Sequence, residues 1–533
     1  REFMGHKVSP WKWEAPILWK LETEQAKQKP ESSALVKAGD RLYGHAGKLL
    51  LALDLPSGGK QPRVAWQQQI DGVPSSMIVG DGKLFVVTKE GGLYCFGASP
   101  RTPTIHESKP LPPPSPGDKW AARAAEILRH AGATDGYGLV LGLGTGRLME
   151  ELLQQSQLRV IGVDADAAKV RAIRDKLVAA GFYGTRAEVF VGPPFDFPFP
   201  PYLATLIVSE GLDHRAMDVP VGKVFEALRP YGGVACLEVP TEKQNAFADW
   251  VGRRHLERAE VTRTGDFALL RRFGPLPGSA PWTHEAADTA RTYFSRDQRV
   301  KPPLGILWYG DVESGLYERN DYDSGLKPQV AGGRLFAFQV PTNTLFGYDA
   351  YTGRLCWKRK FDRSTRYASM DDGVYVAVGD RCLVCDAATG KELATFQYDV
   401  GQPAFAKDIR VSDDIILIGV SSTETTVIGK GLWDSTMLVA LDRKTGKLLW
   451  KKQAEERFNK LGIALGGGMV FCIDSLSPIE SERTKVLVEK PTTTPSTLTA
   501  LDARTGETKW TAATTHPFRM FKVDGGLSIR GYD

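Results

Sequence analysis

One phrase recurs along this chain and limits what most of it can fold into. An apolar stretch ends in Asp, a Thr-Gly or Ser-Gly turn follows, and a short strand closes with Trp, as in LVALDRKTGKLLW at residues 438–450. Asp binds the backbone of its own turn and Gly accepts the positive φ that closes it, so each copy predicts a β-hairpin. The alternating apolar residues on both sides predict strands that bury one face.

Copies of the phrase occur at both ends of the chain. They lie at residues 50–66, 91–98 (a partial copy), 345–357, 382–396, 438–450 and 498–510. A further pair of strands lies upstream of several copies, which makes about four strands per unit, the content of a propeller blade. A β-sandwich does not require one turn-and-Trp phrase to recur, so the repeats favour an all-β propeller.

These repeats resemble the pyrroloquinoline-quinone-type β-propeller family, which includes quinoprotein alcohol dehydrogenases and outer-membrane assembly lipoproteins. In that family the strand-end tryptophan docks between neighbouring blades, and the resemblance carries this role onto Trp66, Trp357, Trp450 and Trp510. Residues 281–310 resemble the entry segment of such a propeller, with Trp308 as its closing aromatic. The family has seven or eight blades, of which we count about six here.

Between Ala98 and Pro281 the phrase disappears and the apolar period changes from 2 to 3.6. Strands such as LRVIGVDAD alternate with amphipathic helices, which predicts a doubly wound, mostly parallel α/β sheet inserted between blades. We therefore predict four segments along the chain. They are propeller blades over 1–98, a proline-rich linker over 99–115, an α/β domain over 116–275 and further blades over 281–533.

The first strand of the α/β domain runs into GLGTG, residues 142–146. Glycines at this turn let a ligand approach the backbone at the carboxyl edge of the sheet. Asp164 ends the next strand, at a distance along the chain that suits hydrogen bonds to ribose hydroxyls. The spacing is G-x-G-x-G and not G-x-G-x-x-G, an amphipathic helix precedes it, and the last strand reads DFALLRRF. In these features residues 116–275 resemble the class I S-adenosylmethionine-dependent methyltransferase domain, a Rossmann-like fold.

That resemblance implies S-adenosylmethionine as the cofactor. It would lie over Gly142, Gly144, Thr145 and Gly146, with its ribose on Asp164 and with Asp196 as the nearest acid after the third strand. The sequence departs from the family at three positions. Gly142 replaces a frequent acid, Leu148 replaces a third glycine, and Pro193 and Pro194 stand near the place of an acid beside the adenine.

Candidate catalytic residues follow the fourth strand in IVSEGLDH. Glu210, Asp213 and His214 would lie at the edge where substrate meets cofactor. Glu210 is a candidate base for a hydroxyl or amine, and His214 a group that titrates near neutrality. The plainer interpretation is that all three are solvated loop residues.

Three classes of function stay open. The first is a methyltransferase whose propeller face recruits a protein or another large substrate. The second is a binding or scaffold protein with a degenerate methyltransferase domain. The third is a quinone-dependent dehydrogenase. Such an enzyme requires a calcium site and often has two adjacent cysteines, and this chain has no adjacent pair of cysteines.

Composition and charge indicate which kinds of binding partner the chain is suited to. The net charge of +5 is spread over short mixed runs, so a nucleic-acid partner is not indicated. Apolar runs stay well below the 18 or so residues of a membrane span. Cys382 and Cys385 form a lone CxxC within a strand, so we expect core packing and no metal. The propeller resemblance favours the periplasm whereas cofactor supply favours the cytosol, which leaves the compartment open.

Overall fold

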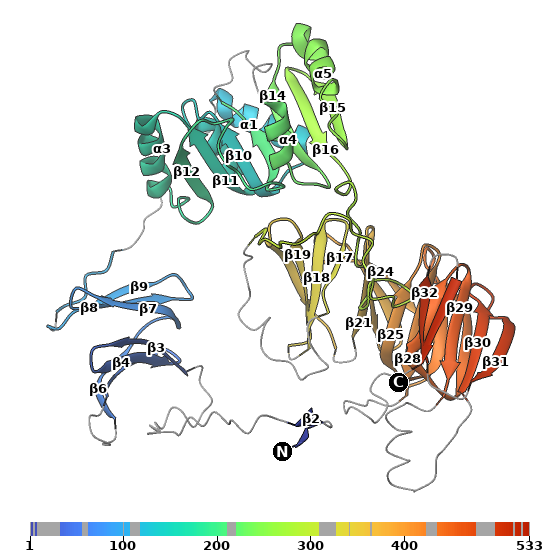
Figure 1. Cartoon of the computed structure of the whole chain (residues 1–533). Coiled ribbons are helices and arrows are strands. Elements are labelled where there is room, and N and C mark those ends of the chain that lie inside the picture. Colours follow the sequence, from blue (N-terminus) through green and yellow to red (C-terminus); the bar gives the residue numbers. More distant parts are fainter. Residues whose placement is uncertain are drawn as a thin grey trace. The chain divides into compact units, whose positions relative to one another are not determined.

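The chain divides into two compact units, Arg1–Glu107 and Ser108–Asp533, in a computed structural model (Figure 1). The structure describes residues 2–3, 6–7, 32–55, 62–99, 101–106, 118–210, 220–308, 327–340, 342–362, 365–422, 434–475, 496–514, 518–523 and 526–531.

The first unit contains antiparallel sheets. After the short pair β1 (Glu2–Phe3) and β2 (His6–Lys7), one sheet has the order β3-β4-β5-β6 and another the order β7-β8-β9. Their strands are β3 (Ser32–Ala38), β4 (Arg41–Ala46), β5 (Leu49–Asp54), β6 (Arg63–Gln69), β7 (Pro74–Gly80), β8 (Lys83–Thr88) and β9 (Leu93–Phe96). The two sheets share a small core, and Trp66 contacts Phe96 with ring centroids 5.2 Å apart.

The second unit begins with an α/β domain built on one seven-stranded sheet of order β12-β11-β10-β13-β14-β16-β15. The first five strands in this order are parallel, and β16 and β15 are antiparallel to their neighbours. The strands are β10 (Asp135–Leu141), β11 (Gln157–Asp164), β12 (Ala187–Val191), β13 (Ala204–Val208), β14 (Gly233–Glu238), β15 (Ala259–Thr264) and β16 (Phe267–Arg272).

Helices cover both faces of this sheet (Figure 1). They are α1 (Lys119–Ala131), α2 (Arg147–Gln155), α3 (Ala167–Ala179), α4 (Val221–Ala227), the 3-10 helix η3 (Thr241–Lys243) and α5 (Gln244–Gly252). α1, α2 and α3 pack on one face around Val140, and α4 and α5 on the other around Leu139 and Leu141. This is the doubly wound arrangement that the alternation of strands and helices predicts. Strand order reverses beside β10, and the carboxyl end of the strands at such a reversal is where ligands bind in sheets of this kind.

The rest of the second unit consists of antiparallel sheets, as the repeats predict. Their orders are β17-β18-β19-β20, β21-β22-β23-β24, β25 through β31 in sequence, and β32-β33. The strands are β17 (Gln329–Ala331), β18 (Arg334–Gln339), β19 (Thr344–Asp349), β20 (Leu355–Lys360), β21 (Arg366–Met370), β22 (Gly373–Val378), β23 (Arg381–Cys385), β24 (Glu392–Gln397), β25 (Phe405–Val411), β26 (Ile415–Ser421), β27 (Asp434–Asp442), β28 (Leu448–Gly466), β29 (Met469–Asp474), β30 (Ser496–Asp502), β31 (Thr508–Thr514), β32 (Phe518–Val523) and β33 (Gly526–Gly531).

The long strand β28 joins two of these blade-like sheets. Its first half pairs with β27 and its second half with β29, and the pairing register shifts between Phe458 and Ile463. β28 is therefore the last strand of one four-stranded sheet and the first strand of the next. The first strands lie side by side, β17 by β21, β21 by β25 and β25 by β28, which is the arrangement of propeller blades.

Aromatic residues at strand ends dock on the turn of the following sheet. The indole N–H of Trp357 donates to the carbonyl of Ala387 at 3.0 Å, and that of Trp450 to the carbonyl of Ala503 at 2.9 Å. A Cβ on Gly390 or Gly506 would lie 2.6 Å from the docked indole. Glycine is therefore needed at both positions, because it adopts the positive φ of the turn and leaves room for the indole.

Trp308 and Phe396 dock in the same way, on the turns that contain Gly353 and Gly446. The predicted role of the strand-end aromatics therefore holds for Trp357 and Trp450. Trp510 differs, because it is 44% exposed and packs against Phe471.

We expect Trp450→Ala to lower the free energy of unfolding by about 3–5 kcal/mol, because Trp450 is only 8% exposed and wedged between two sheets. Urea unfolding followed by circular dichroism measures the change. Trp510→Ala is the matched control and should cost less than about 1 kcal/mol. Equal losses for the two variants would show that docking on the next turn does not stabilise the sheets.

The α/β domain contacts the first of these sheets through the amino edge of its own sheet. The guanidinium of Arg229, just before β14, binds Asp349 at 2.5 Å, and Arg334 binds the same carboxylate at 3.1 Å. Arg229 and Asp349 are buried, and a Cβ on Gly333 would lie 2.7 Å from the Tyr231 ring.

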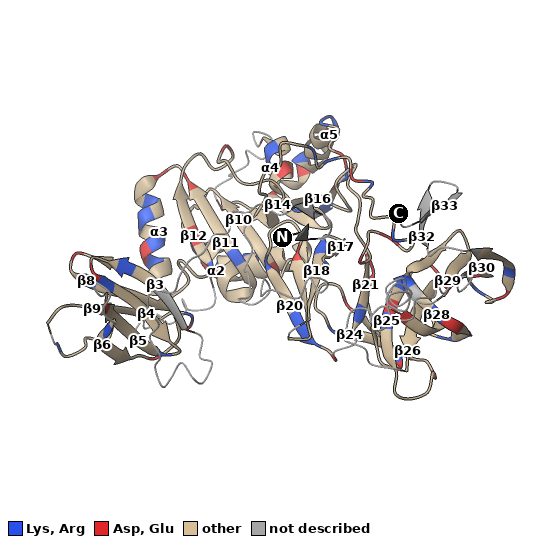
Figure 2. Ribbon diagram, turned by 60° about the horizontal axis from the view of Figure 1, so that its bottom comes forward, with Lys and Arg blue, Asp and Glu red and all other residues tan. Residues whose placement is uncertain are grey.

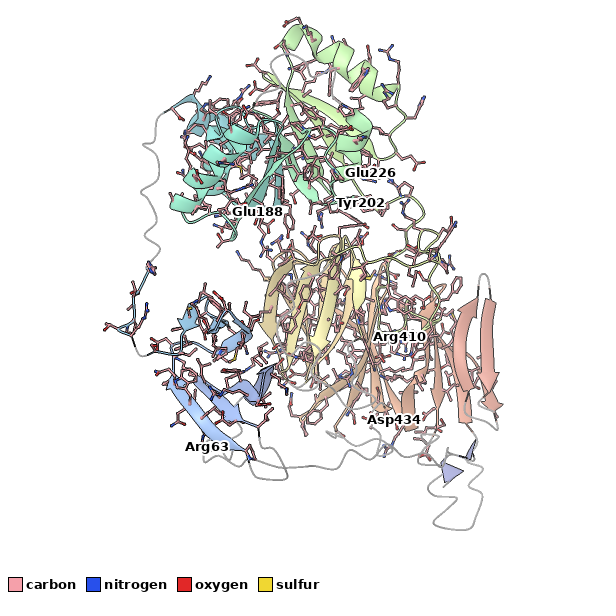
Figure 3. The ribbon with its side chains drawn as sticks, turned by 60° about the vertical axis from the view of Figure 1, so that its left-hand side comes forward. Arg63, Glu188, Tyr202, Glu226, Arg410 and Asp434 are labelled. Carbon is pink, nitrogen blue, oxygen red and sulfur yellow. The ribbon has the colours of Figure 1, made fainter. Side chains whose placement is uncertain are left out.

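Other residues of this edge reinforce the contact. Asp135 at the start of β10 pairs with Arg354 at 2.9 Å, and the Tyr202 ring meets Tyr351 at 5.8 Å. Tyr202, whose N–H donates to the Glu226 carbonyl, lies with Glu226 at this end of the domain in Figure 3. The carboxyl edge, with the glycine turn, lies at the opposite end of the strands.

We expect Arg229→Ala to lower the free energy of unfolding by about 2–3 kcal/mol. The loss stays below that of a fully orphaned buried charge because Arg334 still faces Asp349. Asp135→Asn, which removes an exposed ion pair of the same contact, should cost about 1 kcal/mol or less. Urea midpoints of the three proteins measure both effects, and an unchanged midpoint for Arg229→Ala would contradict a stabilising contact.

Candidate functional site

The glycine turn connects β10 to α2 at the carboxyl edge of the sheet. Gly142, Gly144 and Gly146 have φ of +83°, +51° and +82°, a region that L side chains rarely adopt. The N–H of Gly142 donates to the Val163 carbonyl at 2.9 Å, which fixes the turn to the neighbouring strand. Gly146 is the N-cap of α2, so the first backbone N–H groups of the helix have no partner within the helix itself and lie at this edge of the sheet.

Two of these glycines are closely approached by other parts of the domain. A Cβ on Gly146 would lie 2.9 Å from Ile173 of α3, so this glycine is required for packing. A Cβ on Gly144 would lie 2.7 Å from the Glu210 side chain. The space over Gly144, which we expected to receive a ligand, is therefore occupied by the chain's own carboxylate.

Glu210 follows β13 and folds back onto the glycine turn. Its carboxylate accepts the backbone N–H of Thr145 at 2.6 Å and of Leu148 at 3.0 Å, and also the Thr145 hydroxyl. Backbone N–H groups at a helix N-terminus attract anions, which explains why the carboxylate settles there. Leu148, where the family has a third glycine, thus contributes its N–H to the same spot.

Asp164 ends β11 beside this turn. Its carboxylate accepts the N–H of Leu143 at 2.9 Å, the N–H of Asp166 at 3.0 Å and the ammonium of Lys169 at 2.9 Å. Burial raises the pKa of Asp164, but the hydrogen bonds from Asp166, Lys169 and Leu143 outweigh it and hold the pKa below the usual value. Asp164 is therefore ionised at neutral pH.

The remaining predicted site residues are not gathered at the turn. Asp196 lies in the exposed segment after β12 and pairs with Lys223. His214 and Asp213 lie outside the described residues, so the structure does not test them. The catalytic role of Glu210 also stays a prediction.

The sequence reasoning missed two features of this edge. Lys169 lies five residues after Asp164, in the first turn of α3, and this spacing was a visible signal for the ion pair. Phe190 at the end of β12 is exposed and contacts Phe197 at 5.6 Å, which adds an apolar surface after the third strand. The alternating FDFPF pattern at residues 195–199 was its signal.

The cysteines and the other possible metal ligands were candidates for further chemistry. Cys382 and Cys385 lie buried in β23 as free thiols, which confirms core packing for the CxxC pair, and burial raises the pKa of Cys382 to about 12. No three His, Cys, Asp or Glu side chains in the described part of the chain are placed to share a metal ion. Among those same residues, no helix is both long enough and apolar enough to cross a bilayer. Figure 2 shows basic and acidic residues interspersed along the ribbon.

Two family models match this chain. One described as a methyltransferase domain matches residues 139–232, which include the glycine turn, Asp164 and Glu210. One described as outer membrane protein assembly factor BamB matches residues 383–521. Both assignments agree with the strand orders above.

Among curated proteins, polyvinylalcohol dehydrogenase of Sphingopyxis sp. (strain 113P3) is 26% identical over 212 residues. The match covers 34% of this chain and 32% of that protein, so the chain spans about a third of the relative's length.

Solved methyltransferase structures overlay on part of the chain. A putative S-adenosyl-L-methionine-dependent methyltransferase from Methanococcus maripaludis is 15% identical, with a TM-score of 0.25, over 30% of this chain and 85% of its own. A methyltransferase from Geobacter sulfurreducens is 17% identical, with a TM-score of 0.24, over 30% and 80%. The domain assignment rests on the family matches and the strand order.

Proposed function

We propose that this chain, which combines a methyltransferase domain with a pyrroloquinoline-quinone-type propeller domain, is an S-adenosylmethionine-dependent methyltransferase. The observation that carries the proposal is the glycine turn between β10 and α2. Its backbone presents the N–H groups of Thr145 and Leu148 at one spot, and the ionised Asp164 lies beside it.

The donors at this edge suit the cofactor's chemistry. The N–H groups of Thr145 and Leu148 already hold a carboxylate, so they suit the carboxylate of the methionine part. Asp164 accepts hydrogen bonds, which suits the ribose hydroxyls. When bound, S-adenosylmethionine supplies an electrophilic methyl group, and the protein's main task is to position the acceptor in line with it.

Glu210 has two consequences for this site. Its carboxylate must leave the glycine turn before another anion can take the same donors. Once displaced, it is free to accept a proton from a hydroxyl or amine acceptor, as a general base does. Glu210 therefore links cofactor entry to the availability of a base.

We infer that the propeller binds the methyl acceptor, a protein or another large molecule, because the methyltransferase domain itself is small. The contact through Arg229 and Asp349 uses the amino edge of the sheet. A bound acceptor must therefore extend to the opposite, carboxyl edge to reach the methyl group.

The finer topology belongs to the same proposal. We infer that both β regions are parts of one propeller of seven or eight blades, interrupted by the methyltransferase domain. β9 has the partial phrase GGLYCFGA, which stops where other copies have their turn, and LGILW at 304–308 has the form of a closing strand. The indole of Trp308 docks on the Ala350 carbonyl at 2.9 Å, as the closing aromatics of other copies do. We infer from this that the methyltransferase domain is inserted between blades.

Two other functions have support of their own. Lys169 on Asp164 and Glu210 on the glycine turn favour a scaffold with a degenerate methyltransferase domain. The likeness to a polyvinylalcohol dehydrogenase favours a quinone-dependent dehydrogenase. Reconstitution with pyrroloquinoline quinone, followed by its absorption spectrum, separates the dehydrogenase from the other two.

Calorimetric titration with S-adenosylhomocysteine tests the proposed function. We expect saturable binding by the intact chain, about tenfold to a hundredfold weaker binding by Asp164→Ala through loss of charge-assisted hydrogen bonds, and none by Gly144→Val. Asp175→Ala, an exposed residue of α3, is the control and should bind as the wild type does. Absence of heat and of a thermal shift at millimolar ligand would reject the methyltransferase and favour the scaffold.

We expect Glu210→Ala to bind S-adenosylhomocysteine about three- to tenfold more tightly than the wild type, because no internal carboxylate then competes for the donors, a net effect of roughly 1 kcal/mol. Turnover of the same variant should fall if Glu210 is the base. Glu188→Ala, an acid on β12, is the control. Weaker binding by Glu210→Ala would show instead that Glu210 holds the ligand.

A further inference from the structure

A second cluster of charged side chains lies among the blade-like sheets, away from the methyltransferase domain. Residues 282–293 run across the first strands of four sheets. Trp282 pairs with Val330 of β17, the Thr283 carbonyl accepts the N–H of Ser369 on β21, and the His284 ring accepts the N–H of Val411 on β25 at 3.0 Å. The Thr289 carbonyl accepts the N–H of Leu465 on β28 at 3.2 Å.

This segment and the neighbouring strands line a small, partly open cavity, here called the charged cavity. Its charged lining includes Arg291, Arg366, Arg410, Glu285, Asp288 and Asp408. Arg410, on β25, is labelled among these strands in Figure 3. The cavity volume is about 20 Å³, which is enough for one or two particles of the size of a water molecule.

Positive charge exceeds negative charge around the charged cavity. Glu285 is shared by Lys327 at 2.7 Å, Lys460 at 3.0 Å and Arg291 at 3.6 Å. With the three lining arginines, the nearby Lys327 makes four cations against three carboxylates, a net charge of +1. Lys460 adds only part of a charge near neutral pH, because burial lowers its pKa to about 7. His284 does not add to the positive charge, because burial, Arg410 and Arg291 lower its pKa to about 3.

Two of the guanidinium groups at the charged cavity have fewer hydrogen-bond acceptors or carboxylate partners than a buried guanidinium usually has. Arg366 donates to the carbonyls of Lys407 and Thr365 but pairs with no carboxylate among the described residues. Arg291 is only 5% exposed, and within the described part of the chain its Nε–H finds no acceptor. A buried charge without a counter-charge, or a buried donor without an acceptor, is costly.

We propose that the charged cavity binds one compact monoanion, a halide ion or a carboxylate group of formate size. Such an anion supplies the missing negative charge and an acceptor for Arg291, and guanidinium groups suit both halides and carboxylates. The small volume excludes a nucleotide, a quinone cofactor or a sugar acid. Because residues 282–293 contact four sheets, the anion joins the sheets around their first strands.

Thermal unfolding of the full chain at constant pH and ionic strength tests this site. Sodium gluconate, whose anion is too large for the cavity, is replaced stepwise by sodium chloride, sodium formate or sodium sulfate. We expect the midpoint to rise and saturate with chloride or formate. With sulfate it should rise only in the gradual, non-saturating way in which an excluded salt stabilises a folded protein. If chloride raises the midpoint at a lower concentration than formate does, the site prefers a halide. The reverse order indicates a carboxylate site. A midpoint that shows no saturating rise with either chloride or formate would overturn the proposal.

Arg291→Gln should weaken the saturable effect of the preferred anion by about tenfold or more. Arg359→Gln, which removes a surface ion pair with Glu392, is the control and should respond as the wild type does. If Arg291→Gln does not fold, chloride-35 NMR line broadening of the wild type, with and without formate as competitor, decides the question. Equal anion dependence in Arg291→Gln, or no broadening that formate removes, would refute the site.

Discussion

The blade-like sheets of the second unit are joined by one recurring contact, the docking of a strand-end aromatic ring on the turn of the following sheet. Trp357 and Trp450 each donate an indole N–H to a turn carbonyl and cover a glycine that has no room for a side chain. The turn itself forms because Asp442 and its equivalents accept the N–H groups two or three residues on. One short phrase therefore encodes both a hairpin and its attachment to the neighbour, which is why it can be repeated along the chain.

The methyltransferase domain is held by a different kind of interaction. Arg229, Arg334 and Asp349 form a buried charged group in which the acid is also the turn-forming residue of its hairpin. The same Asp thus closes a turn and receives a guanidinium from another domain. Because this contact lies at the amino edge, the glycine turn and Asp164 at the carboxyl edge are left out of it.

The sequence predicts local and periodic features well and spatial pairings poorly. The turn phrase, the change of period at the insertion, and the GLGTG turn followed by Asp164 are all local patterns, and their elements form as predicted. The docking of Glu210 on Thr145 and Leu148 joins residues more than 60 positions apart and depends on β13 ending beside β10. The charged cavity likewise unites residues of several strands, none of which forms a recognisable motif alone. Trp510 matches the phrase yet remains exposed, since the phrase does not specify what lies against the ring.

Two neighbouring blade-like sheets share the single strand β28, which couples their unfolding. Its 19 residues carry the outer hydrogen-bond ladder of one sheet and the inner ladder of the next, with no loop between them. Opening that reaches the middle of this seven-stranded array must break hydrogen bonds of the same strand, so we expect the two sheets to exchange their protected amide hydrogens as one subglobal unit. The sheets formed by β17–β20 and β21–β24 share no strand, so each has the covalent freedom to open by itself. A continuous strand thus makes one pair of neighbours a single foldon within an otherwise modular array.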